Sequence, residues 1–385
     1  MRDLFQNDHQ RELRARGFSR RDFARWATLL TAGAALPFYN EAALAQDLRA
    51  IGIIPPDAVK INANENPMGP CPAALEAMRA VLPQGGRYLF NHTFAFMDTM
   101  AEVEGLPGTH VLPFAGSSDP LHRAVLAFTS PSRPLVIADP GYEAPERAAS
   151  FIGAKVITVP LRKDFSHDPQ AMAGADPNSG VIYVCNPNNP TGSVTRKDDI
   201  NTIVANMPKG CILLLDEAYI HFATNATPAV DLVASDKDVI ILRTFSKLYG
   251  MAGLRAGAAL GRPDLLEKLK GFGGLGIMPA TGMAGATAAM KQKGLIAERR
   301  KIMADIRNDL CAWLSKKGYA FVPSEANMVM IDTQRPGRQA IGAMLAKKVA
   351  IGRVWQSMPN HVRVTIGTAD EMAKFKTAFE RVMES

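Results

Sequence analysis

The sequence is short of cysteine and of aromatic residues. Its four cysteines (Cys71, Cys185, Cys211 and Cys311) show neither CxxC nor CxxH spacing, which argues against a structural zinc site and a disulfide framework. Aromatic residues make up 7% of the chain, so the core must depend on aliphatic residues and the 18 methionines. Lysines and arginines are scattered without interleaved aromatic residues. The net charge of +7 therefore indicates solubility rather than nucleic-acid binding.

The sequence also lacks internal repeats and low-complexity linkers. Hydrophobic residues make up 47% and charged residues 21%, which is the balance of a folded soluble protein and excludes a disordered chain. A chain of 385 residues is long for one ordinary domain. It suits two domains, or one large domain with a smaller partner.

The N-terminus has the pattern of a secretory signal. Seven arginines and four acids occupy the first 25 residues, and a weakly apolar segment follows from Trp26 to Leu36. An A-x-A site at residues 43–45 then precedes Gln46. This is the order of a basic region, a short apolar region and a cleavage site. The apolar segment is too short to anchor stably in a bilayer.

Arg20 and Arg21 resemble the paired arginines of twin-arginine signals, which export proteins already folded. We therefore expect a periplasmic protein that uses the twin-arginine export machinery, with residues 1–45 outside the fold. The alternative is an ordinary basic amphipathic helix, and the protein would then be cytoplasmic.

Apolar, β-branched runs that alternate with helix-like stretches indicate an α/β fold with a mainly parallel sheet covered on both faces. The last hundred residues change character and indicate a smaller α+β domain. The expected strands are Leu135–Ala138, Lys155–Val159, Val181–Cys185, Ile212–Leu215 and Val239–Leu242, with helix-like stretches at Pro72–Val81 and Leu121–Phe128. The smaller domain begins with helix-like Lys291–Lys317 and continues through Asn327–Asp332, Ala340–Lys348 and His361–Ile366.

Polar residues follow four of the expected strands. Ligands bind beyond the carboxyl ends of the strands in such sheets. Four polar strand ends in succession, which supply an aromatic ring, an amide, a carboxylate and a lysine, indicate a single site. The segments are Asp139–Tyr142, Asn186–Gly192, Asp216–Tyr219 and Arg243–Lys247.

Lys247 is either a surface lysine or an amine that forms a Schiff base. Such an amine needs a low pKa, which the nearby Arg255 would supply by like-charge repulsion. The hydroxyls of Thr244 and Ser246, together with this guanidinium, also suit a phosphate. A Gly/Ser turn at residues 116–118 precedes an expected helix and would add backbone amides to an anion site.

Asp216 follows the apolar run Cys211–Leu215, where a carboxylate is costly unless a positive group meets it. A protonated pyridine nitrogen would meet that need and would make the ring a better electron sink. Tyr219 and Asn189 could donate hydrogen bonds to a phenolic oxygen on the ring. Tyr142 could stack on its face.

These segments carry a resemblance to a known family. The chain from about residue 55 to the C-terminus resembles the fold-type I, pyridoxal-phosphate-dependent class I/II aminotransferases, and most closely the histidinol-phosphate aminotransferase family. The motifs that carry the resemblance are Ile61–Pro67, Asn186–Gly192, Asp216–Tyr219, Ser246–Lys247 with Gly253–Arg255, and Val362–Thr368.

The resemblance implies a role for each candidate residue. Lys247, Asp216 and Tyr219 would be catalytic, with Lys247 in the Schiff base to pyridoxal 5′-phosphate. The family is dimeric with shared sites, so we expect a homodimer in which Tyr88 reaches the partner's cofactor phosphate. The residues that bind the amino acid or 2-oxo acid substrates would be Arg363, Asn64 and Arg353. Arg353 could instead be a solvated arginine at the end of a strand. The other cofactor-binding residues would be Ser117, Ser118, Tyr142, Asn189, Thr244, Ser246 and Arg255.

The resemblance also implies a division of the chain. We expect a signal segment at 1–45, an N-terminal arm at 46–70 that joins the small domain, a large cofactor-binding domain at 71–284 and a small domain at 285–385.

Three segments depart from the family pattern: Arg87–Phe90, Gly116–Asp119 and Gly274–Pro279. By the resemblance, these departures leave the cofactor site intact and change substrate-facing segments. Export also conflicts with a role in histidine biosynthesis, which is cytoplasmic. The alternatives are therefore an aromatic or specialised amino acid aminotransferase, or a decarboxylase or lyase on the same fold. A non-catalytic binding protein is disfavoured because the cofactor set is complete.

Overall fold

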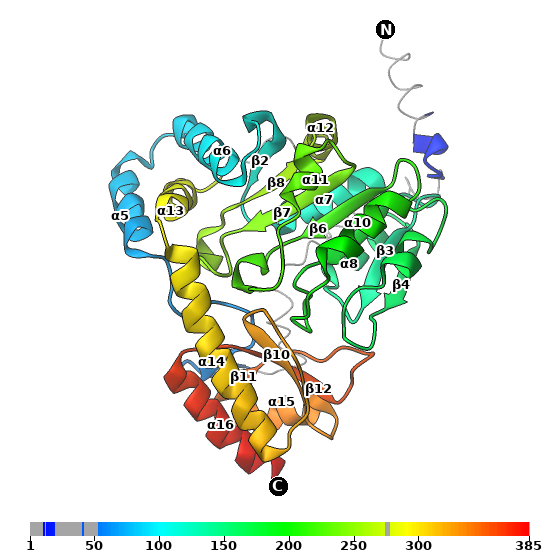
Figure 1. Ribbon diagram of the computed structural model, residues 1–385. Helices are drawn as coiled ribbons and strands as arrows, with labels where there is room; N and C mark the ends of the chain where they lie inside the picture. Colours follow the sequence, from blue (N-terminus) through cyan, green and yellow to red (C-terminus); the bar gives the residue numbers. More distant parts are fainter. Residues whose placement is uncertain (1–10, 12, 20–40, 42–52, 274–277, 385) are drawn as a thin grey trace.

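The computed structural model describes residues 11, 13–19, 41, 53–273 and 278–384. The chain forms a large part around a twisted sheet and a smaller part near the C-terminus, with the long helix α14 (Leu295–Lys317) leading from one toward the other (Figure 1). None of the helices within those residues is long and apolar enough to cross a membrane.

Within the described residues, seven strands form the large sheet in the order β2-β8-β7-β6-β5-β3-β4. The five expected strands pair in parallel, which confirms the predicted sheet, whereas β8 runs antiparallel to both its neighbours. The strands are β2 (Val111–Phe114), β3 (Leu135–Asp139), β4 (Val156–Pro160), β5 (Val181–Cys185), β6 (Ile212–Asp216), β7 (Val239–Thr244) and β8 (Gly257–Gly261).

Both faces of this sheet are covered. Successive side chains of a strand point to opposite faces, and along β6 Ile212 and Leu214 pack in one core whereas Leu213 and Leu215 pack in another. The helices of the large part are α5 (Pro72–Val81), η1 (Leu82–Gln84), α6 (Phe90–Glu104), η2 (Gly108–His110), α7 (Ser118–Phe128), α8 (Ala144–Phe151), α9 (Pro169–Ala173), α10 (Lys197–Asn206), η3 (Ile220–Phe222), α11 (Val230–Ala234), η4 (Ala252–Leu254), α12 (Pro263–Lys270) and α13 (Ala280–Lys291).

The smaller part combines the early strand β1 with elements from the C-terminal part of the chain. Strand β10 lies between β9 and β12 and is antiparallel to both, while the early strand β1 pairs in parallel with β11. The predicted boundaries at residues 45, 70 and 284 stay predictions. The remaining elements are β1 (Val59–Ile61), β9 (Phe321–Val322), β10 (Met328–Asp332), α15 (Gly337–Ala346), β11 (Val349–Ile351), β12 (His361–Thr365) and α16 (Ala369–Met383).

Candidate active site

A cavity of about 270 Å³ lies at the carboxyl edge of the large sheet. In the parallel register Cys185 pairs with Asp216, and Asp216 pairs with Leu242, so the segments that follow these strands start at one edge. Ten of the residues that the sequence singled out line the cavity together. They are Ser117, Ser118, Tyr142, Asn189, Asp216, Tyr219, Thr244, Ser246, Lys247 and Arg255.

Lys247 is buried, and its Nζ donates a hydrogen bond of 3.0 Å to the backbone oxygen of Asn64. Burial lowers the pKa of Lys247 to about 8, because the charged amine loses hydration. The arginine whose charge adds to this effect is Arg363. The expected repulsion from Arg255 is not among the main causes of the lowered pKa. The guanidinium of Arg255 is instead directed to Ser246 and to the backbone oxygens of Ala252 and Ala115.

Asp216 ends strand β6 inside the protein. One carboxylate oxygen accepts a hydrogen bond from the Tyr183 hydroxyl at 3.0 Å, and the other accepts from the Ala218 N–H at 3.1 Å. Burial raises the pKa of Asp216 to about 6. A positive charge beside this carboxylate would keep it ionised at neutral pH.

The Asn186–Gly192 loop mainly builds the wall that presents Asn189. The side chain of Asn186 exchanges hydrogen bonds with the backbone of Thr195 at 2.9 and 3.0 Å. Asn188 donates to the Pro140 carbonyl at 3.1 Å and to the Thr191 hydroxyl at 2.9 Å. These amides hold the loop, so that Asn189 lines the cavity.

An anion cradle occupies one end of the cavity. The Thr244 hydroxyl donates to Ser246 Oγ at 2.9 Å, and Arg255 Nη1 donates to the same oxygen at 3.3 Å. Helix α7 begins at Ser118, so its free backbone amides and its positive dipole end lie at the cavity. Gly116 has a φ of 94°, and a side-chain carbon there would overlap the Arg255 guanidinium.

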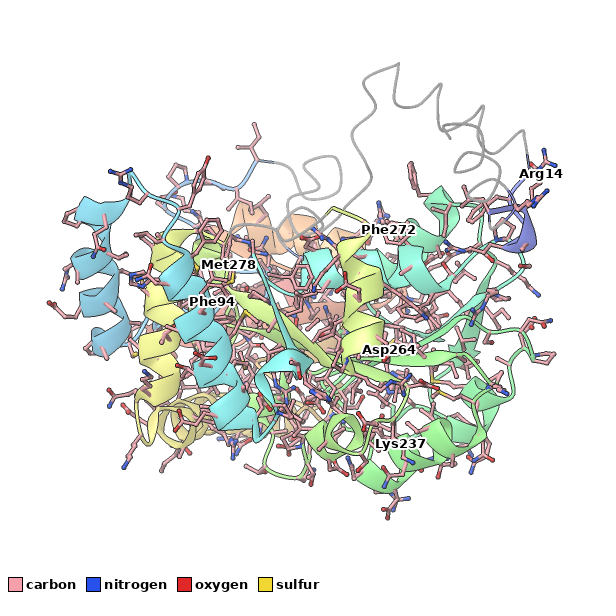
Figure 2. The ribbon with its side chains drawn as sticks, turned by 90° about the horizontal axis from the view of Figure 1, so that it is seen from above. Arg14, Phe94, Lys237, Asp264, Phe272 and Met278 are labelled. Carbon is pink, nitrogen blue, oxygen red and sulfur yellow. The ribbon has the colours of Figure 1, made fainter. Side chains whose placement is uncertain are left out.

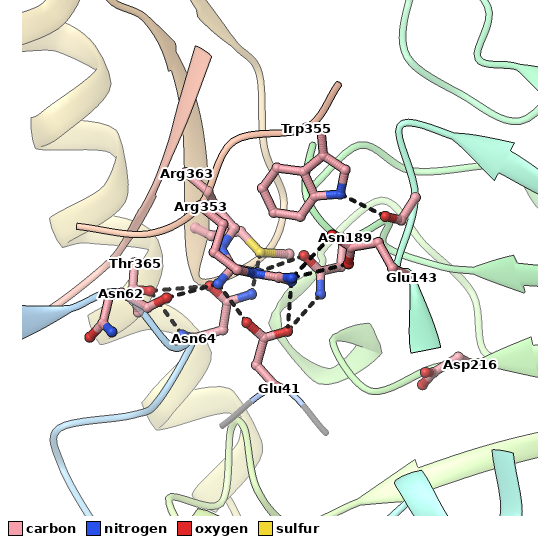
Figure 3. A network of polar contacts seen from close by, with 12 residues as sticks. Glu41, Asn62, Asn64, Glu143, Asn189, Asp216, Arg353, Trp355, Arg363 and Thr365 are labelled. Carbon is pink, nitrogen blue, oxygen red and sulfur yellow. Dashed lines mark hydrogen bonds and ion pairs between the residues drawn. The ribbon is translucent and has the colours of Figure 1, made fainter. Parts of the chain in front are cut away.

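Two arginines, Arg353 and Arg363, lie at Trp355 (Figure 3). Neither is among the residues that line the cavity, but Arg363 reaches its wall at Asn189. Arg363 is fully buried, and its Nη1 donates to Asn189 Oδ1 at 2.8 Å while its Nη2 donates to the Asn62 carbonyl at 2.8 Å. Arg353 contacts both carboxylate oxygens of Glu143 at 3.1 Å. The guanidinium carbons of Arg353 and Arg363 lie 4.7 and 5.4 Å from the centre of the Trp355 ring.

Arg353 is thus no solvated strand-end arginine, because its side chain is 13% exposed and paired. Asn64 lies close to the predicted substrate residues. Its Nδ2 donates to the Tyr219 hydroxyl at 3.0 Å, and its Oδ1 accepts from the Thr365 hydroxyl at 3.1 Å. Tyr88, in contrast, is 69% exposed beside Phe90 and does not line the cavity of its own chain. Its predicted contact with a partner subunit stays a prediction.

Sequence reasoning missed several residues of the site. Trp355 lies two residues after the predicted Arg353, and Glu143 directly follows the predicted Tyr142. This proximity in sequence was the available signal. Glu41 was set aside with the signal segment, yet it lines the cavity. Within the described residues, no group of three or more His, Cys, Asp or Glu side chains could hold a metal ion.

The donor set fits pyridoxal 5′-phosphate. Asp216 offers a buried carboxylate to a protonated ring nitrogen, and the cradle at Arg255 offers hydroxyls and a guanidinium to a phosphate. Lys247, an amine whose pKa is about 8, lines the same cavity.

Comparisons with known proteins agree with this fit. The family described as aminotransferase class I and II matches residues 56–379. Histidinol-phosphate aminotransferase 1 of Nitrosococcus oceani is 32% identical over 331 residues, which cover 85% of this chain and 89% of that protein. An aromatic amino acid aminotransferase of Cutibacterium acnes is 30% identical over 318 residues, which cover 81% and 88%.

A solved structure extends the likeness to the fold. Histidinol-phosphate aminotransferase from Sinorhizobium meliloti, crystallised in complex with pyridoxal-5′-phosphate, is 26% identical with a TM-score of 0.79, covering 91% of this chain and 96% of that one. Since the family match spans most of the sequence and the cavity holds the matching donor set, the chain belongs to the class I and II aminotransferases and is a pyridoxal-phosphate-dependent enzyme similar to histidinol-phosphate aminotransferases.

Proposed function

We propose that the enzyme moves the amino group of an anionic donor, an amino acid or an amino-phosphate, to a 2-oxo acid such as 2-oxoglutarate. The observation that carries this proposal is the placement of Arg363. Its guanidinium is fully buried and donates hydrogen bonds to Asn189 of the cavity wall and to the carboxylate of Glu41, which lines the cavity. A buried planar guanidinium recognises a carboxylate or a phosphate through two parallel hydrogen bonds.

In this proposal each residue of the site has one task. Bound pyridoxal phosphate supplies an electron-withdrawing ring that delocalises the electron pair left on the substrate Cα. Lys247 would take the proton from the substrate Cα as general base and deliver it to the C4′ carbon of the bound cofactor as general acid. Asp216 would stabilise the positive charge on the ring nitrogen, and Asn189 and Tyr219 would hold the ring's phenolic oxygen. Arg363 fixes the anionic end of the substrate, which orients the Cα–H bond toward Lys247.

A donor screen tests the function. The chain that starts at Gln46, loaded with cofactor, is mixed with 2-oxoglutarate and separately with histidinol phosphate, aromatic amino acids and other amino acids. Glutamate that appears with at least one donor supports the proposal. Carbon dioxide without glutamate would instead assign a decarboxylase. The likeness to the Cutibacterium acnes enzyme makes an aromatic amino acid the second candidate donor.

We further propose a homodimer with shared sites. Five exposed apolar side chains lie on α5, η1 and α6 and on the connection before α6: Leu75, Leu82, Tyr88, Phe90 and Phe94. Figure 2 places Phe94 across the molecule from Arg14. A second copy of the chain would cover this apolar face and bring Tyr88 toward the partner's cofactor phosphate.

Light scattering tests the dimer. The unchanged chain is expected to have twice the protomer mass, and the double change Phe90→Ser, Phe94→Ser is expected to lower it to one protomer. Ile302→Ser, on the exposed face of α14, serves as the control that leaves the mass unchanged. A monomeric unchanged chain would contradict the proposal.

A further inference from the structure

Glu41 places a carboxylate in the predicted substrate position of the cavity. Its Oε1 accepts a hydrogen bond from Arg363 Nη2 at 2.6 Å, and its Oε2 accepts from Arg353 Nη2 at 3.4 Å and from Asn189 Nδ2 at 3.2 Å (Figure 3). The side chain is 12% exposed and lines the same cavity as Lys247. Both carboxylate oxygens are thereby engaged.

These contacts are the ones that the carboxylate of an incoming substrate would need. Arg363 directs Nη1 to Asn189 and one Nη2 hydrogen to the Asn62 carbonyl, so the Nη2 hydrogen that meets Glu41 is not engaged by the cavity wall. Two carboxylates at one guanidinium would repel each other in a site of low dielectric constant. Binding of Glu41 and binding of the substrate carboxylate therefore exclude each other.

We propose that Glu41 is an intramolecular competitor of the substrate carboxylate, so that the chain that keeps its N-terminal segment inhibits itself and loss of that segment opens the site. This inference rests on the proposed role of Arg363 in binding an anionic substrate.

A second contact of the N-terminal segment supports the proposal. Arg16 Nη2 donates to three backbone oxygens at the end of helix α7, those of Leu126, Ala127 and Thr129, at 3.0 to 3.2 Å. Phe18 is buried in the core of the large part. The segment is thus bound to the folded body at a point other than Glu41. A tethered group has an effective concentration in the millimolar range, so one carboxylate suffices to compete.

The charge state of Glu41 makes the contact persistent. Burial alone would raise the pKa of Glu41, but Arg363, Arg353 and Lys247 lower it to about 2. The carboxylate therefore stays ionised from mildly acidic to alkaline pH, and protonation does not release it. Release follows from a competing anion or from removal of the segment.

The test compares four cofactor-loaded proteins: the full chain, the chain that starts at Gln46, Glu41→Gln and Asp8→Asn. The last makes a similar change of charge elsewhere in the segment. The KM and kcat for an amino donor are measured, and binding of maleate, a dicarboxylate without an amino group, is followed by calorimetry. A millimolar tethered carboxylate with an inhibition constant of about 0.1 mM raises the apparent KM roughly tenfold.

The proposal expects KM and the maleate Kd to fall about tenfold in the Gln46 chain and in Glu41→Gln, with kcat nearly unchanged, while Asp8→Asn behaves like the full chain. Equal KM and Kd in all four proteins would overturn it. Tighter binding in the Gln46 chain alone would also overturn it, since Glu41 would then not be the competitor. Maleate binding decides between these outcomes even if no donor yields glutamate, a result that would count against the proposed function instead.

Discussion

Among single residues, Lys247 has the property most directly tied to the chemistry. Its pKa of about 8, lowered by burial, leaves about one amine in ten neutral at pH 7. Only the neutral amine attacks an aldehyde. Uptake of pyridoxal phosphate by the cofactor-free enzyme should therefore speed up about tenfold per pH unit below pH 8 and level off above it.

Stopped-flow absorbance measures this profile. Lys247→Ala is the matched variant, and it should neither form the covalent bond nor transaminate, while it keeps its fold and part of its cofactor affinity through the phosphate cradle. A flat profile between pH 6 and 9, or near-normal turnover of Lys247→Ala, would contradict the assignment.

Asp216 is predicted to act through its charge. Asp216→Asn keeps the shape of the side chain and a partner for the Tyr183 hydroxyl, but it removes the charge that holds the proton on the ring nitrogen. Turnover should fall by about two orders of magnitude or more, the effect of losing a buried ionic partner. Steady-state kinetics at saturating cofactor measure the fall. A loss of less than about tenfold would mean that the pairing is wrong.

Arg363 is predicted to grip the substrate. Lysine cannot reproduce the planar fork that meets Asn189, Asn62 and a carboxylate. In the chain that starts at Gln46, Arg363→Lys should lower kcat/KM about tenfold or more, with cofactor affinity little changed. If thermal stability falls while kcat/KM stays near that of the unchanged chain, Arg363 has only a structural role.

Much of the site follows from residue type and position. A lysine, a carboxylate and an amide at successive strand ends indicate one cavity, and the cavity contains them. Contacts between distant segments do not follow from the sequence. Tyr183 supports Asp216 from a neighbouring strand, and Trp355 lies across two arginines, because the folded chain brings them together.

At the level of elements, the turn before helix α7 carries the phosphate cradle. Gly116 has a positive φ, and a methyl group there would overlap the Arg255 guanidinium. Gly116→Ala should therefore displace Arg255 and weaken cofactor binding about tenfold or more, the effect of losing one charge-assisted contact. Fluorescence titration measures the affinity. Gly108→Ala is the control, because a side-chain carbon there meets nothing within 4 Å. Equal affinities would exclude this role of the turn.

The strands that the sequence predicted share one trait, a run of β-branched or long aliphatic residues. Strand β8 (Gly-Ala-Ala-Leu-Gly) has no β-branched residue, and β2 contains Pro113, so neither has a strand-like pattern. The small side chains of β8 have a packing reason in the fold. A side-chain carbon at Gly257 would overlap the backbone of Gly116 beside the phosphate cradle. Close packing of segments far apart in sequence overrides local propensity here.

For the whole molecule, we propose export by the twin-arginine route. Arg20 and Arg21 lie outside the described residues, as do residues 43–45, so this proposal stands on the sequence pattern. Replacement of both arginines by lysine should abolish export, since the receptor reads the pair as an address. Cell fractionation follows the protein. Unchanged periplasmic protein would leave a general secretory signal, and protein wholly in the cytoplasm without any change would remove the signal.

The parallel pairing of β1 with β11 has a consequence for the order of synthesis. The ribosome makes β1 early, but its partner strand emerges nearly three hundred residues later. Asn64 lies just after β1, and its backbone oxygen accepts a hydrogen bond from the Lys247 amine. Its backbone N–H donates to the Thr365 hydroxyl at 2.9 Å. A nascent chain therefore cannot fix Asn64 beside Lys247 in this way until its last strands have been made.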